Sequence, residues 1–158
     1  MSIERVREYF REKGIEYRIQ EFEVSSATVA LAAQALHCEE SRIAKTLSFH
    51  KEDRVLLIVA AGDVKIDNPK YKKQFGTKAK MLSAGEAEEL VGHGVGGICP
   101  FGVKEGVEVY LDVSLRRFDT VFPACGSSNS AIELSIEELE EYAGCIEWVD
   151  VCKFMEKS

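Results

Sequence analysis

The sequence has few of the residues that build metal centres or disulfide frameworks. Its three histidines, His37, His50 and His93, are scattered. Its five cysteines include no Cys-x-x-Cys pair, and their odd number and irregular spacing are typical of a protein from a reducing compartment. No credible Ser–His–Asp set is present either. We therefore expect no metal and no cofactor.

Long apolar runs are also missing. No run approaches the length that spans a bilayer, and residues 1–5 lack the apolar core of a signal peptide. The sequence has no internal repeat and no low-complexity linker. We therefore expect a single domain over residues 1–158, located in the cytoplasm and without a membrane partner.

The charge is acidic overall but unevenly distributed. The net charge of −7 argues against a protein that coats nucleic acid. Six lysines nevertheless fall within residues 65–80 against one acid, Asp67, and glutamates gather near the C-terminus. A local basic face would fit a partner that touches one side only, such as the end of an RNA. A solvated helix surface is the alternative.

Hydrophobic periodicity and turn residues predict short helices and strands in mixed order. Helices are predicted at 3–13, 27–36, 69–75, 84–91 and 136–143, and strands at 15–22, 42–49, 55–61, 107–113, 120–124, 131–134 and 145–151. Residues 42–61 should form a hairpin. The alternation is not a regular βαβ series, so the prediction is an α+β fold with a mixed sheet.

Helix starts are marked by capping residues. Ser83 with Glu86 and Ser135 with Glu138 match the capping box, and Asn68 followed by Pro69 predicts another helix start.

Residues 92–102 hold five of the twelve glycines and one of the three prolines. Within them, Gly96 and Pro100 form a Gly-x-x-x-Pro unit, which Pro100 stiffens at its far end. Such a loop can turn bare N–H groups outward to hold an anion or a developing oxyanion. A tight connection that binds no ligand is equally compatible with the glycine content.

Lys45 lies among apolar neighbours at the start of a predicted strand. A lysine in this position either extends its ammonium group along the apolar surface to solvent or directs it at an anion in a cleft. Thr46 should point to the opposite face of the strand.

Three segments in this order, 42–47 (RIAKTL), 96–102 (GGICPFG) and 131–134 (AIEL), resemble the YbaK/ProX family of aminoacyl-tRNA deacylases. This family is related to the editing insertion of bacterial prolyl-tRNA synthetases. The resemblance runs over residues 3–142. It implies a single editing domain whose mixed, partly barrel-like sheet is surrounded by short helices.

The resemblance implies hydrolysis of the ester that joins a small, wrong amino acid to the terminal ribose of a tRNA. The partner would be the acceptor end of mischarged aminoacyl-tRNA, and an aminoacyl-tRNA synthetase is a second candidate partner. Lys45 matches the residue most closely tied to activity. Gly96 and Gly97 begin the loop that faces the ester, and substrate contacts extend to Thr46 and to the rest of that loop, which comprises Ile98, Cys99 and Pro100.

Two further positions follow from the resemblance. Phe22 matches a position that is often aromatic and could pack on the adenine or the amino acid, although a core phenylalanine is the alternative. The loop that includes Gly126 and Ser128 departs from the Gly-Lys-Arg-Gly type of several members. The lysine and arginine of that loop type are absent here, so the tRNA contacts that they would make are in doubt. Their absence also affects the expected amino-acid specificity.

Two other functions stay open at this level. The fold could hold a tRNA end or a synthetase without turnover. Alternatively, Cys99, six residues after His93, could be an activated thiol nucleophile, which would require a cationic neighbour.

Overall fold

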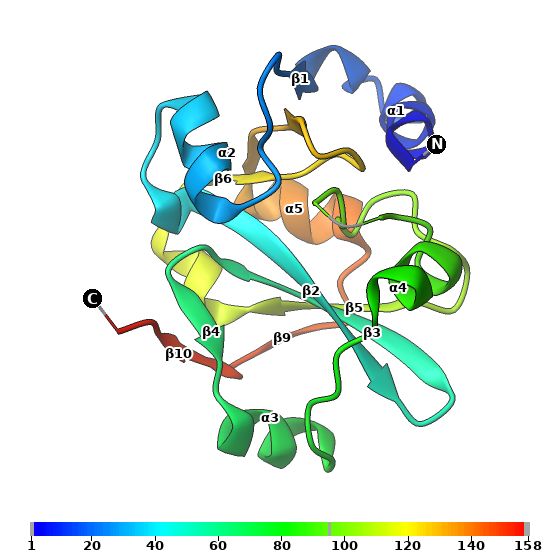
Figure 1. Ribbon diagram of the computed structural model, residues 1–158, viewed down its shortest axis with the longest axis vertical. Coiled ribbons are helices and arrows are strands. Elements are labelled where there is room, and N and C mark those ends of the chain that lie inside the picture. Colours follow the sequence, from blue (N-terminus) through cyan, green and yellow to red (C-terminus); the bar gives the residue numbers. More distant parts are fainter. Residues whose placement is uncertain (1, 95, 157–158) are drawn as a thin grey trace.

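The computed structural model describes residues 2–94 and 96–156 of the 158. Its centre is a six-stranded sheet with the strand order β8-β6-β2-β3-β5-β9 (Figure 1). The strands of this sheet are β2 (Ile43–Lys51), β3 (Arg54–Ala61), β5 (Glu108–Asp112), β6 (Thr120–Pro123), β8 (Leu134–Ser135) and β9 (Glu147–Val149). Two-stranded pairs are formed by β1 (Gln20–Glu21) with β7 (Ser130–Ala131) and by β4 (Val64–Ile66) with β10 (Cys152–Phe154).

The β2–β3 hairpin forms the middle of the sheet and confirms the predicted pairing. Its register runs from Ala44 opposite Ala61 to Lys51 opposite Arg54, which leaves two residues for the turn. Glu52 adopts a left-handed conformation with φ of 57° there, as a two-residue hairpin turn requires. Every residue of β3 except Arg54 is buried, because this strand is covered on both faces.

The sheet is mixed, as predicted. The β2–β6, β3–β5 and β5–β9 pairs are parallel, whereas β2–β3 and β6–β8 are antiparallel. The sheet curls into half a barrel. The predicted α+β fold with a partly barrel-like sheet is therefore confirmed.

Short helices surround this sheet. The α-helices are α1 (Ser2–Glu12), α2 (Val29–Leu36), α3 (Asn68–Phe75), α4 (Ala84–Leu90) and α5 (Ile136–Ala143), and the 3-10 helices are η1 (Glu16–Arg18), η2 (Glu40–Arg42) and η3 (Val113–Arg117). Both capping boxes form as predicted, at Ser83 and Ser135. The cap of α3 is Asp67, whose side chain accepts from the Lys70 amide; the prediction of Asn68 was one residue late.

Three strand predictions were wrong in detail. Residues 15–22 form η1 and the two-residue β1, not one strand. The predicted strand at 131–134 divides into β7, which pairs with β1, and β8, which pairs with β6. The segment 145–151 forms β9 alone, and the β4–β10 pair was not predicted at all.

The core has a large and a small part. Buried side chains of β3, β5, α1 and α5 make the large part, together with Phe10, Phe49, Tyr71 and Phe101. In the small part, Ala32 and Ala33 of α2 pack against Ile43 and Phe122. Through this contact the alanine-rich helix α2 packs closely on the sheet, and the contact forms one wall of a pocket.

Candidate functional site

A pocket of about 150 Å³ lies between α2, the first residues of β2 and the glycine-rich loop at 92–102, which we call the glycine loop. Predicted site residues from distant parts of the chain meet in it, namely Lys45, Thr46, Gly96 and Ile98. The wall also includes Ser26, Ala27, Thr28 and Val29 before and within α2, and Phe122, Ala124 and Ser130 from the β6–β7 region. The lining is mainly apolar with a few hydroxyl groups, and its size suits a small side chain.

Lys45 is the cation of this pocket. The side chain is partly buried, and its ammonium group donates to the Val64 carbonyl at the start of β4. Among the described residues, no carboxylate forms an ion pair with it. Burial lowers the pKa of Lys45 from its usual value, although Cys152 and Asp63 nearby oppose the shift. Lys45 is therefore a partly buried charge that Asp63 stabilises from nearby without forming an ion pair with it.

Thr46 carries a buried hydroxyl group. Its Oγ1 has no hydrogen-bond partner within the described part of the chain. Because a buried hydroxyl group without a partner costs free energy, Thr46 Oγ1 is an unmet hydrogen-bonding group inside the protein, at a residue that lines the pocket.

The glycine loop passes close to two other segments, and this closeness explains its composition. Gly96 has φ of +83°, and a Cβ there would lie 3.0 Å from Ala27 Cβ and 3.2 Å from Ser128 Cβ. A Cβ on Gly97 would lie 2.5 Å from the Gly126 carbonyl carbon, a distance that real side chains do not show. Glycine is needed at both positions because the loop packs directly on these neighbours.

The amides of this loop are unequal. The Gly97 amide donates to the Gly94 carbonyl at 3.1 Å, so its donor is already used within the loop. The backbone amides of Gly96 and Ile98 donate to no acceptor among residues 2–94 and 96–156. Of the two glycines predicted to be catalytic, Gly96 thus lines the pocket with an available donor, and Gly97 provides close packing.

Cys99 does not face the pocket. Its side chain is fully buried, and burial raises the pKa of its thiol to about 12. His93, 3.6 Å away, donates from Nε2 to the Phe101 carbonyl at 2.7 Å, and burial lowers the pKa of its imidazole. A neutral ring with its near nitrogen already donating cannot stabilise a thiolate. The geometry therefore contradicts the thiol-nucleophile alternative.

The other predicted site residues are not among those that line the pocket. Pro100, the residue after Cys99, is buried, and Phe22 is half-buried. The Phe22 amide donates to the Asn129 carbonyl at 2.8 Å, and the Ser26 amide donates to the Ser128 carbonyl at 2.6 Å. The loop that contains Gly126 and Ser128 thus holds the segment before α2 in place.

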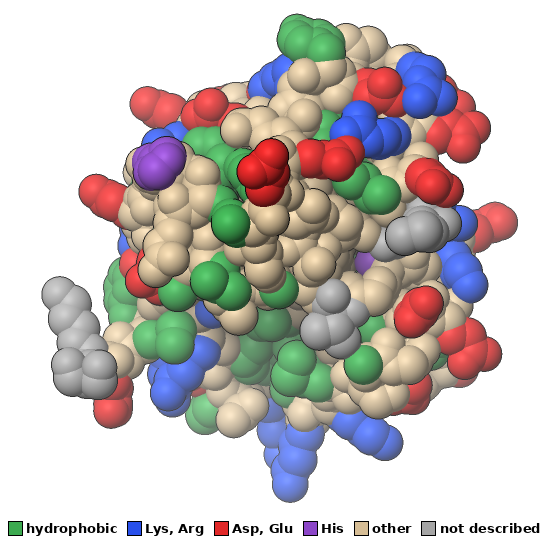
Figure 2. Space-filling view, turned by 45° about the horizontal axis from the view of Figure 1, so that its top comes forward, with side chains coloured by type: hydrophobic (Ala, Val, Ile, Leu, Met, Phe, Trp, Pro, Cys, Tyr) green, Lys and Arg blue, Asp and Glu red, His purple; other side chains and the backbone are tan. Residues whose placement is uncertain are grey.

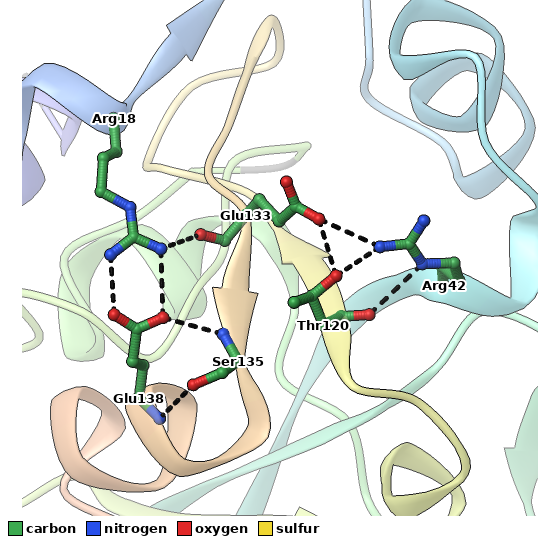
Figure 3. A network of polar contacts seen from close by, with 6 residues as sticks. All are labelled: Arg18, Arg42, Thr120, Glu133, Ser135 and Glu138. Atoms are coloured by element: carbon green, nitrogen blue, oxygen red, sulfur yellow. Dashed lines mark hydrogen bonds and ion pairs between the residues drawn. The ribbon is translucent and has the colours of Figure 1, made fainter.

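A network of ion pairs and hydrogen bonds lies beside the pocket wall (Figure 3). Arg42 donates to Glu133 and to Thr120, and its guanidinium lies 4.9 Å from the centre of the Phe122 ring. Arg18 donates to both carboxylate oxygens of Glu138 and to the Glu133 carbonyl. The network fixes β6, β8 and the residue before β2 relative to one another, and these elements carry Phe122 and Ile43 of the wall.

Sequence reasoning missed part of the wall. Thr28 is the N-cap of α2, a role that capping alone explains, and Ser26 and Ser130 are small polar residues without a distinctive pattern around them. Phe122 resembles any buried strand residue. Only the pairing of β6 with β2 shows that it faces the pocket.

In the part of the chain that the structure describes, no group of three or more His, Cys, Asp or Glu side chains could hold a metal ion. None of the described helices has the length and apolar character needed to cross a membrane.

Comparison with known proteins agrees with this architecture. The chain is 57% identical to Uncharacterized protein YwhH of Bacillus subtilis (strain 168) over 97% of this chain and 98% of that protein. It is 30% identical to the proline--tRNA ligase of Bacillus cytotoxicus over 59% of this chain but only 16% of the ligase. A crystal structure proposed to be that of a trans-editing enzyme for prolyl tRNA synthetase superposes with a TM-score of 0.87, at 27% identity and over 96% and 97% of the two chains.

Residues 23–142 match the family described as the aminoacyl-tRNA editing domain. This segment includes every wall residue of the pocket named above and most of the central sheet. The chain belongs to the aminoacyl-tRNA editing domain family.

Proposed function

We propose that the protein is a trans-editing hydrolase that cleaves the ester bond of mischarged aminoacyl-tRNA carrying a small amino acid. The observation that carries this proposal is the convergence of Lys45, Thr46, Gly96 and Ile98 on one pocket of about 150 Å³ in a chain of the editing family. The pocket would take the amino acid and the terminal ribose.

The chemistry would rest on placing and polarising the ester. Hydrolysis puts negative charge on the carbonyl oxygen, and the available amides of Gly96 and Ile98 are suited to stabilise it. One such donor typically contributes about 3 kcal/mol. Water, or the side chain of the amino acid itself, would attack the ester carbon, the C–O bond to the ribose would break, and the ribose oxygen would take up a proton.

Lys45 would supply the positive charge. When substrate enters, its ammonium group would exchange the Val64 carbonyl for a phosphate oxygen of the terminal nucleotide or for the ester itself. Such an exchange is favourable because a carbonyl dipole balances an ammonium charge less well than an anion does.

The test is a deacylation screen over tRNAs mischarged with small amino acids, run with wild type, Lys45→Ala and Lys51→Ala. Lys51 is a matched control because it lies on the same strand and is paired with Glu108. We expect Lys45→Ala to lower kcat/KM at least about 100-fold and Lys51→Ala to leave it within about twofold. Saturable tRNA binding without hydrolysis of any substrate would instead identify a non-catalytic binding module.

A further inference from the structure

Five lysines of residues 65–80 are exposed and have no carboxylate partner in the described part of the chain: Lys65, Lys72, Lys73, Lys78 and Lys80. Among the residues that the structure describes, Lys70 alone in this segment forms an ion pair, with Asp150 at 3.1 Å. The sequence contains 27 Asp and Glu residues, so a shortage of carboxylates does not explain why these lysines are unpaired. Lys and Arg side chains project along the lower edge of the molecule in Figure 2, the end at which Figure 1 places α3.

A second observation concerns the β4–β10 pair. Lys153 lies directly opposite Lys65 in the antiparallel register, and both side chains are exposed. Like charges in opposite positions destabilise a strand pair, and an anion between them would remove the repulsion. We call the five lysines together with Lys153 the basic face.

The basic face also contains a groove. Its lining includes Lys72 and Lys78 with Asn68 and Pro69 between α3 and the segment that follows it. The lining of this groove is mainly apolar, so Lys72 and Lys78 would bind phosphate oxygens with ammonium groups at its rim.

The basic face begins next to the pocket. Lys45 donates to the carbonyl of Val64, and the next residue along β4 is Lys65. From there β4 leads directly into α3. A chain of phosphates that starts at the pocket can thus continue over β4 and β10 towards α3.

We infer that the basic face binds the phosphate backbone of the RNA whose 3′ end enters the pocket. This inference rests on the proposed function, and it adds where the body of the tRNA lies. The continuity with the pocket favours RNA over an acidic protein or an anionic membrane. The face would add affinity without reading sequence, because lysine to phosphate contacts are insensitive to the base.

The first experiment measures equilibrium binding of uncharged tRNA at several KCl concentrations, so it needs no hydrolysis. Lys72→Gln/Lys78→Gln is compared with Lys13→Gln/Lys104→Gln, which removes the same charge from the residue after α1 and from the segment after the glycine loop. We expect only the first variant to bind several-fold more weakly, with the slope of log K against log salt reduced by about 1 per lysine removed. Equal weakening by both variants, or by neither, would overturn the inference.

A kinetic experiment separates the basic face from the pocket. With aminoacyl-tRNA, Lys72→Gln/Lys78→Gln should raise KM several-fold and leave kcat unchanged, whereas with an aminoacylated CCA trinucleotide both constants should equal those of wild type. A loss of kcat on the trinucleotide would contradict a role limited to backbone binding. Binding to vesicles containing phosphatidylserine that depends on these lysines, without tRNA binding, would overturn the inference in favour of a membrane.

Discussion

The protein holds its partly buried cations in two different ways. In the network of Figure 3, Arg18 and Arg42 are surrounded by carboxylates and carbonyls, and the Arg18–Glu138 pair is bidentate. In the pocket, Lys45 donates to a single carbonyl and has no ion-paired carboxylate among the described residues, although Asp63 lies nearby. Paired charges hold elements together, whereas a partly buried charge without an ion-pair partner costs stability and is ready for an anionic ligand. The difference indicates a structural role for the network and a binding role for Lys45.

The largest effect on stability should come from a substitution that disturbs the close packing of the glycine loop against residues 126–127. Gly97→Ala places a Cβ 2.5 Å from the backbone carbon of Gly126 and should lower the free energy of unfolding by about 3 kcal/mol. Gly85→Ala in α4 is the control, because its Cβ would meet nothing within 4 Å and a helical alanine should raise stability by about 0.5–1 kcal/mol. Urea unfolding curves of both variants measure these changes. Equal stability of the two variants would show that the glycine loop does not pack on residues 126–127.

The next effect concerns the network. Arg18→Met removes two bonds to Glu138 and one to the Glu133 carbonyl, so we expect a loss of about 2 kcal/mol at pH 7. Arg54→Met should cost less than about 0.5 kcal/mol, because Arg54 is largely exposed and Glu108 keeps Lys51. Thermal or urea unfolding distinguishes the two.

The same pair predicts a pH dependence. Arg18 lowers the pKa of Glu138 to about 2 from an ordinary value of 4.5. The resulting stability is present above pH 4.5 and is lost as the pH falls from there towards 2, because the unfolded state takes up the proton first. Arg18→Met should therefore lose less stability over this range than wild type. Parallel curves for the two proteins would contradict the assigned ion pair.

The smallest effect is expected for Lys45→Met. Burial lowers the pKa of Lys45 in the folded state, so between that pKa and about 10.5 the unfolded state binds more protons, and stability from this group rises with pH. The variant lacks this dependence. The free energy of unfolding of Lys45→Met minus that of wild type should decrease as the pH approaches 10.5. A difference independent of pH would mean that the ammonium group is fully solvated.

Local patterns determined much of this protein. The β2–β3 hairpin, the two capping boxes and the stop of α5 at Gly144, with φ of 62°, follow from residues within a few positions of one another. The resemblance to the editing family rested on the order of three short segments, and the family match confirms it. Lys45 as a site residue stays a prediction, supported by its place in the pocket.

Tertiary structure decided what depends on distant partners. The strands β1, β4, β7 and β10 are two or three residues long, and such segments become strands only through pairing across 86 to more than 100 positions of sequence. Likewise, Cys99 is a candidate nucleophile in the sequence but a buried core residue in the structure. The Gly97 amide, predicted to face the substrate, donates to the Gly94 carbonyl instead. Solvent exclusion and hydrogen-bond partners are properties of the packed chain, so no local pattern could have specified them.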